Sequence, residues 1–173
     1  LVGNAGGACE LRYDDVKKLE TTSAGTLTSG IIQAKANSGN AAQTLLKLTN
    51  TDATSSGETD QTADIEFEFT DNPGNSYKAA KIGAYKAADW HGNSDYDAGL
   101  KFFTVNNSAS FENAYTERLK ITEDGEVSIP DNGKFTAGTS DDLQLYHDGS
   151  HSHLIHENTG NLYVLCKSGQ INF

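Results

Sequence analysis

The chain has 173 residues, a formal net charge of −11 and only 36% hydrophobic residues, with 17 glycines. So acidic a chain repels nucleic acid and anionic lipid, which speaks against both as partners. No window approaches the ~20 apolar residues that a membrane span needs, so we expect no membrane insertion. Serine, threonine, asparagine, aspartate and glycine separate short apolar runs, which favours turns and strand ends over helices.

The two ends of the sequence indicate a piece of a longer protein. The chain contains no methionine and begins at Leu1. It stops at Phe173, shortly after an apolar run over residues 162–165. We therefore expect further residues before and after it.

The first sixty residues are rich in glycine, serine and threonine and are predicted to form a repeat-like β segment. Leu19, Thr22, Gly25 and Leu27 fit a strand, a glycine-containing turn and a returning strand. Residues 41–48 have apolar positions that suit either a helix or a strand. Turn-forming residues bound them tightly on both sides, and we predict a strand.

Alternation with a period of two is strongest in residues 63–70, where it predicts a half-buried strand. Ile65, Phe67 and Phe69 are expected to face one way. The intervening carboxylates are expected to face the other way: Asp64, Glu66 and Glu68. Residues 71–75 contain proline and glycine in turn positions and predict a turn after this strand.

Four further strands are predicted downstream: residues 77–84, where alternation is weaker, 100–105, 118–122 and 126–129. Glu-Asp-Gly at residues 123–125 is a hairpin signal between the last two. Residues 61–130 are therefore predicted to form a compact antiparallel β domain, arranged like a β-sandwich.

A short internal repeat links the two ends of the chain. The pattern at Leu19 recurs at Leu119 and Leu154: Thr or Glu three residues on, Gly six on and an apolar residue eight on. One such unit cannot bury its own apolar face, so it needs neighbours along the chain or from other chains. Residues 131–173 are predicted as a second repeat-like β segment. The whole, divided into residues 1–60, 61–130 and 131–173, is predicted to be all-β and elongated.

Three stretches of the sequence carry motifs that occur together elsewhere. Residues 10–25 are ELRYDDVKKLETTSAG, and residues 141–150 are DDLQLYHDGS, followed by Gly-Asn-Leu at 160–162. Between them, residues 64–125 run from DIEF through LKFF to ERLKITEDG. In this order the motifs resemble tail-fibre and related virion proteins of marine bacteriophages, above all cyanophages. The resemblance covers most of the chain apart from residues 51–62.

The resemblance implies a homotrimeric component of a phage tail fibre or spike, located in the extracellular virion. Such a component joins other virion proteins to the host surface and contacts a host-surface glycan or protein. The implied chemistry is mechanical and adhesive, so we expect no enzyme.

His151 and His153 form the sharpest candidate site for chemistry. In a strand their side chains would share a face, about 7 Å apart along it. On a threefold axis, three strands would supply six imidazoles to one transition-metal ion such as Fe, Ni or Zn. In the resembling family Asn and Tyr usually stand at these positions, so the pair departs from that pattern. The alternative is a pair of exposed histidines with no cofactor.

Aromatic side chains near residue 90 are the candidate receptor contacts. Trp90 and His91 lie in a polar loop between strands, and Tyr96 follows closely. Exposed aromatic rings on such loops often bind sugars. Tyr85 and Tyr115 are further candidates. The alternative is that Trp90 covers the edge of the core.

Two other classes of protein compete with the fibre hypothesis. A polysaccharide-cutting tailspike would use paired carboxylates, for which Asp64, Glu66 and Glu68 are candidates. It would also need a larger β-helix body than 173 residues provide, and we expect these carboxylates to be solvated. A sugar-binding β-sandwich module of a cellular protein is the second alternative. Trimerisation separates the fibre from this module, and release of soluble sugar identifies the tailspike.

Overall fold

The structure is a computed structural model of the chain. It describes residues 2–3, 9–23, 25–29, 32, 44, 46–51, 61–91, 96–106 and 114–171. Every regular element within these ranges is a β strand, and the described part of the chain contains no helix. The predicted all-β fold is therefore confirmed. Internal contacts divide the chain into two units, residues 1–47 and 48–173.

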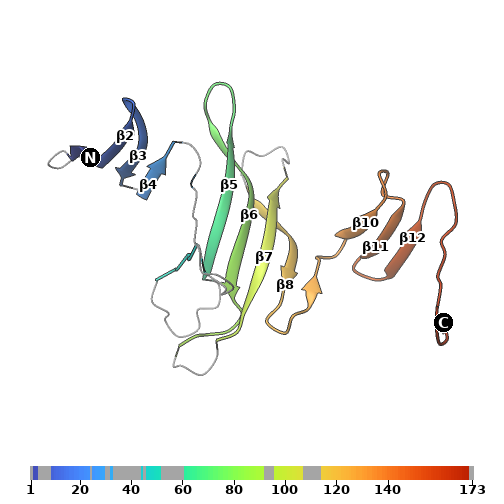
Figure 1. Ribbon diagram of the computed structural model, residues 1–173. Coiled ribbons are helices and arrows are strands. Elements are labelled where there is room, and N and C mark those ends of the chain that lie inside the picture. The colour runs from blue at the N-terminus through green and yellow to red at the C-terminus, as the bar shows by residue number, and fades with distance from the viewer. Residues whose placement is uncertain are drawn as a thin grey trace. The chain divides into compact units, whose positions relative to one another are not determined.

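The first unit contains a four-stranded antiparallel sheet. Its strands are adjacent in chain order: β1 (Val2–Gly3), β2 (Cys9–Tyr13), β3 (Val16–Thr22) and β4 (Gly25–Thr28) (Figure 1). Asp14 and Asp15 join β2 to β3 with positive φ angles of 51° and 58°. A type I′ turn requires positive φ at both central residues, and aspartate tolerates this conformation. Tyr13 therefore pairs with Val16 across a two-residue turn.

The central sheet belongs to the second unit and is a five-stranded antiparallel meander. Its strands are β5 (Thr62–Thr70), β6 (Ser76–Lys86), β7 (Ala98–Val105), β8 (Tyr115–Ile121) and β9 (Val127–Ser128). Each strand pairs with its neighbours in sequence, so these strands form one layer. The antiparallel arrangement was predicted, but the described strands between residues 62 and 128 build one layer and not the two layers of a sandwich. A meander of hairpins leaves both faces of its single sheet open to other partners.

Two β-bulges explain why alternation in the sequence is weaker after β5. Phe67 pairs with Ala80 whereas Glu68 pairs with Lys78, so one extra residue lies in β6. This bulge places Lys78 and Lys81, three residues apart, on the same face. A second shift, between Phe102 and Phe103, inserts an extra residue into β8. A strict period of two therefore holds along β5 but not along β6 or β8.

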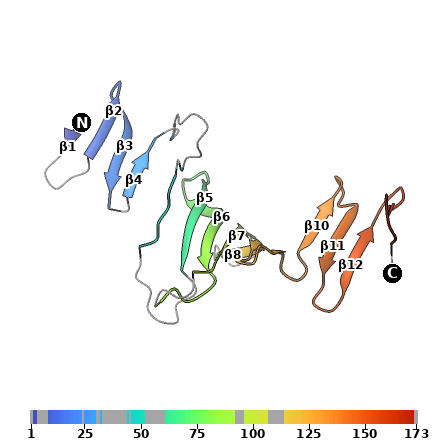
Figure 2. The same cartoon turned by 60° about the horizontal axis from the view of Figure 1, so that its bottom comes forward.

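A three-stranded antiparallel sheet follows in the second unit. Its strands are β10 (Lys134–Ala137), β11 (Leu143–His147) and β12 (Ser152–His156), which lie side by side in Figure 2. β10 pairs with β11 and β11 pairs with β12. Residues 157–171 contain no strand. The three sheets lie within the three predicted ranges 1–60, 61–130 and 131–173, while independent folding of these ranges stays a prediction.

Two sequence predictions need correction. The repeat predicts a returning strand after Gly160, but residues 161–166 are irregular. The first two copies do form the predicted hairpins, β3–β4 and β8–β9. The predicted strand at residues 41–48 falls mostly outside the described residues, and the described positions 44 and 46–48 belong to no strand. Residues 161–166 lack a paired neighbour strand to satisfy their backbone, which propensity along the sequence cannot supply.

Hydrophobic side chains in the described part of the chain are at most half-buried. Within the described residues, no hydrophobic side chain is buried, and the buried polar residue is Gln144. The large apolar residues of β5 illustrate this, since Phe69 is 74% exposed. A sheet with one apolar face normally covers that face with another layer. Each sheet therefore presents a face that its own strands do not cover.

Candidate functional site

The apolar face of the central sheet is its most extensive feature. The strand register places Ile65 opposite Ile82, Ile82 opposite Phe102, and Phe102 opposite Leu119. A row of apolar side chains thus crosses four strands on one face. Phe67 and Phe69 lie on the same face of β5 and are exposed, as the alternation predicted. We call this surface, made by Ile65, Phe67, Phe69, Ile82, Phe102 and Leu119, the central apolar face.

The opposite, polar face of the central sheet is bound together by charged side chains. The Nζ atom of Lys81 lies 2.8 Å from Oδ2 of Asp64, and the Nζ atom of Lys101 lies 3.0 Å from Oε2 of Glu117. All four side chains are less than one third exposed. Glu66 lies directly opposite Lys81 across the β5–β6 pair. The carboxylates considered as a catalytic pair therefore stand among lysines, and Asp64 is held in an ion pair.

Aromatic rings fill the space between these ion pairs. The Lys81 ammonium lies 4.8 Å from the ring centre of Phe103 and 5.1 Å from that of Tyr115. The Lys101 ammonium lies 4.5 Å from the ring centre of Tyr85. Such cation–π contacts add to the ion pairs where the cation is partly desolvated. Desolvation and nearby carboxylates, chiefly that of Glu66, raise the pKa of Tyr115 to about 12.

Two glycines allow the long side chains of the polar face to lie flat. A Cβ atom at Gly83 would collide with the carboxylate of Asp64, its cross-strand partner. A Cβ atom at Gly99 would collide with the ring of Tyr85, its partner on β6. Each glycine thus provides the room that its neighbour's side chain occupies. The polar face is closely packed, although it is a surface.

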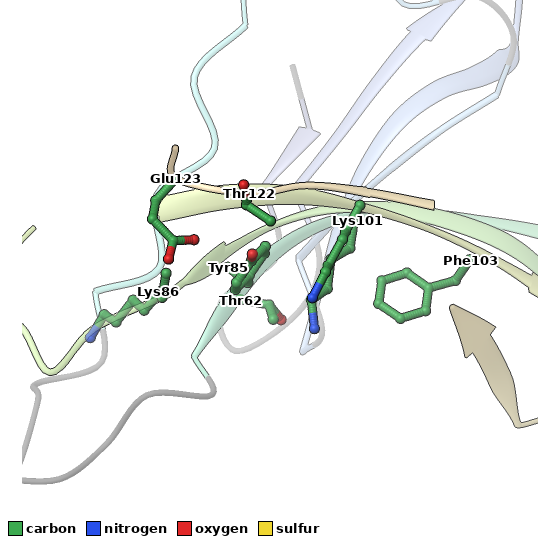
Figure 3. A pocket seen from close by; sticks show the side chains of 9 residues that line it. Thr62, Tyr85, Lys86, Lys101, Phe103, Thr122 and Glu123 are labelled. Atoms are coloured by element: carbon green, nitrogen blue, oxygen red, sulfur yellow. The ribbon is translucent and has the colours of Figure 1, made fainter. Parts of the chain in front are cut away.

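A hollow of about 440 Å³ lies at one end of the polar face, between β5 and the turn after β8. Figure 3 shows Tyr85, Lys101 and Phe103 among the side chains that line it. Two further lysines, Lys86 and Lys120, contribute to the lining. Lys101 is engaged by its ion pair, and Lys86 donates a hydrogen bond to the side-chain oxygen of Gln61. The hollow combines cations, hydroxyl groups and aromatic rings, a mixture that suits a polar ligand such as a sugar.

The predicted receptor contacts are only partly brought together. The rings of Trp90 and Tyr96 meet edge to face, with centroids 5.8 Å apart. Trp90 also donates from Nε1 to the carbonyl of Asp97 and lies under the Lys86 ammonium. Tyr96 is exposed, whereas His91 bonds through its backbone amide to the carboxylate two residues before it. Glycan binding by these residues stays a prediction.

The structure corrects the expectation that His151 and His153 stand on one strand. β12 begins at Ser152, so His151 lies in the preceding turn. The cause is Asp148, whose backbone amide and carboxylate Oδ1 both bond to His151. The two imidazole centroids are 6.4 Å apart, with planes at 61°.

His153 already has two neighbours in its own sheet. Its Nε2 lies 2.8 Å from Oδ2 of Asp148, and its ring stacks on Tyr146 with centroids 4.6 Å apart. On the neighbouring strand β10, Lys134 pairs with Tyr146, and its ammonium lies 4.7 Å from the centre of the Tyr146 ring. The hydrogen bond from His153, followed by the amides of His151 and Ser150, lowers the pKa of Asp148 to about 2.

No set of three or more metal-ligating side chains gathers within the described ranges. A metal ion at the histidines would need ligands from other chains, and it would compete with Asp148 for His153. The transition-metal hypothesis stays a prediction for an assembled trimer.

The C-terminal sheet repeats the two-faced arrangement of the central sheet. Phe135 pairs with Leu145, and Leu145 pairs with Leu154, so one apolar row crosses all three strands. Each of the three side chains is about half exposed. We call these three residues the C-terminal apolar row. In the first unit, Leu11 pairs with Leu19 in a shorter row of the same kind.

Sequence reasoning missed Lys81 and Phe103, and it considered Tyr115 only as a glycan contact. These side chains come together across bulged strand pairs, which period-two alternation cannot locate. Asp148 was detectable, because an Asp-Gly-Ser sequence between two strands predicts a side-chain-capped turn.

Comparison with protein-family models, curated proteins and solved structures gives no match to this chain. A helix long and apolar enough to cross a membrane is absent from the described ranges.

Proposed function

We propose that this chain is a structural, non-enzymatic module of a phage tail fibre or spike that assembles as a homotrimer. It connects other virion proteins to the host surface in the extracellular particle. The assignment of the chain to a phage virion rests on the sequence resemblance. Assembly rests on the uncovered apolar faces of the sheets.

The observation that carries the proposal is the central apolar face. Four strands align Ile65, Ile82, Phe102 and Leu119 in one row, and Phe67 and Phe69 extend it. Full burial of a side chain of this size is worth about 1.5–3 kcal/mol. Ile82, Phe102 and Leu119 are half-buried, and the apolar side chains of β5 are exposed. Exposed apolar surface of this kind marks an interaction site in soluble proteins. Copies of the same chain satisfy all such faces at once, because each copy offers the same surface.

The polar face supports a structural role over catalysis. Its carboxylates are held by Lys81 and Lys101 at 2.8 Å and 3.0 Å. A glycosidase needs one carboxylic acid kept protonated by its surroundings and one kept ionised. The two ion-paired carboxylates of this face, Asp64 and Glu117, each contact a lysine. The arrangement therefore supports stiffening of the sheet without turnover.

Light scattering on the intact chain tests the proposal. We expect a mass three times the chain mass of 18.5 kDa, stable on dilution. A monomer at all concentrations would overturn it.

A carbohydrate-binding module is the second candidate function, and the hollow beside Tyr85 and Lys101 is the observation that favours it. Binding of host-surface polysaccharide by a monomeric chain would favour this module. Release of soluble sugar from the polysaccharide would instead indicate the polysaccharide-degrading tailspike.

A further inference from the structure

The three copies of the internal repeat do not end in the same way. In the first, Thr22 pairs with Gly25 and donates its hydroxyl to the carbonyl of that glycine at 3.1 Å. In the second, Thr122 donates its amide to Glu126 O at 2.9 Å, and its hydroxyl accepts the amide of Glu126 at 3.1 Å. In both, the threonine three residues into the repeat closes the hairpin onto the returning strand.

The third copy has Glu157 at this position, and the backbone amide of Glu157 points toward the preceding strand instead of the returning segment. The amide of Glu157 donates to the carbonyl of Asp142 at 2.7 Å, back toward β11. The side chain of Asn158 also bonds to Asp142. The backbone groups of a strand alternate between its two sides. The third copy is therefore one residue out of phase with the other two, and its turn is tied to the preceding strand.

Because β12 is an outer strand of its sheet, the backbone groups on its outer side have no neighbouring strand among the described residues. The backbone of His151 and that of Glu157 bond to Asp148 and Asp142, so by alternation residues 153 and 155 also bond toward β11. The backbone groups of Ser152, Leu154 and His156 consequently point away from β11. An exposed row of backbone donors and acceptors is a template for another strand.

The segment that should have supplied this strand lies unpaired. Residues 162–165, Leu-Tyr-Val-Leu, are between 44% and 80% exposed and belong to no strand. This composition strongly favours strands. The equivalent segments of the first two copies are β4 and β9, both of which are paired.

We propose that residues 161–165 form a strand that pairs with the free edge of β12 in a second copy of this chain. Pairing Leu154 with Val164 satisfies the exposed backbone groups. It also extends the C-terminal apolar row, Phe135–Leu145–Leu154, by one residue on the same face. A second copy supplies the strand because Glu157 and Asn158 hold the local turn against β11. The inference rests on the proposed self-assembly and names one of its contacts.

Disulfide trapping tests this contact in the full chain, with Cys9 and Cys166 replaced by serine. One preparation carries Leu154→Cys, a second carries Val164→Cys, and the two are refolded together and oxidised. We expect a disulfide-linked pair of chains. It should be at least roughly tenfold more abundant than from a control mixture of Leu27→Cys and Val164→Cys, because a disulfide needs Cβ atoms ~4 Å apart.

A chain carrying both Leu154→Cys and Val164→Cys separates the two possible origins of the strand. A disulfide within single chains, together with no linked pair from the mixture, would overturn the inference while light scattering still showed a trimer. A monomeric mass would overturn the proposed assembly itself. Glu157→Thr restores the closing hydroxyl of the first two copies. We expect it to shift the trapped disulfide of the double variant from between chains to within one chain.

Discussion

The central sheet and the C-terminal sheet each have one apolar and one polar face, but different side-chain contacts hold their polar faces together. Both place apolar side chains in a row across all their long strands and leave that row uncovered. On the opposite face, the central sheet uses ion pairs, such as Lys81 with Asp64. The C-terminal sheet instead stacks Lys134, Tyr146 and His153 over one another and fixes His153 with Asp148.

The comparison shows which face of each sheet has its side-chain contacts satisfied within one chain. The polar-face side chains have partners within the chain, whereas the apolar rows stay at least partly exposed among the described residues. Changes to an apolar face should therefore act on assembly, whereas changes to a polar face should act on the stability of that sheet.

The largest effect is expected from the central apolar face. Phe67→Glu combined with Phe69→Glu places two charges where the proposal buries two rings. With about 1.5–3 kcal/mol lost per ring, association should weaken at least roughly 100-fold. Sedimentation equilibrium measures the change. Glu68→Gln, on the other face of the same strand, should leave the mass unchanged, and a trimer that survives the double substitution would contradict the assembly face.

A smaller loss is expected from the C-terminal apolar row. Leu145→Lys puts a charge at the centre of this row and should weaken association roughly tenfold, because it affects one side chain. Thr139→Lys adds the same charge in an exposed turn and serves as the control. Equal behaviour of the two variants in sedimentation would show that the row is not an interface.

These comparisons also show what the sequence could and could not predict. The strict alternation of β5 predicted its two faces correctly, because no bulge interrupts that strand. The hairpins at Gly25 and Gly125 were predicted by turn residues. The polar-face contacts of Lys81 were not predictable, since one extra residue in β6 changes which side chains share a face. The third copy of the repeat does not form a hairpin. The reason is the direction in which the backbone of Glu157 bonds, toward Asp142, and the glycine-containing pattern does not predict this direction.

A moderate effect on stability is expected from the central polar face. Lys81→Met keeps the apolar stem but leaves Asp64 without its cation at a partly buried position. The free energy of unfolding should fall by roughly 0.5–1.5 kcal/mol. Urea denaturation measures it, and Lys81→Met with Asp64→Asn should recover part of the loss. No recovery would mean that the ion pair does not couple the two residues.

The smallest effect is expected from acid on the C-terminal sheet. The pKa of Asp148 is about 2 in the folded chain, below its ordinary value of 3.8. A depressed carboxyl pKa adds stability that is present above pH 3.8 and is lost as the pH falls through 2. Hydrogen exchange in β11 and β12 should therefore accelerate across this window. Asp148→Asn should remove the pH dependence, and an unchanged profile in that variant would assign it to another group.

β5 is the outer strand of the central sheet, and this position affects how far assembly can go. An outer strand can recruit another strand, and repeated recruitment gives a fibril without a fixed end. Asp64, Glu66 and Glu68 stand at alternate positions along it, so a second β5 laid alongside would bring carboxylates against carboxylates. Growth by edge addition is thus disfavoured at this strand, whereas face-to-face contact is not. We therefore expect the same three acidic residues, which look like a candidate catalytic set, to limit how many chains join the proposed assembly.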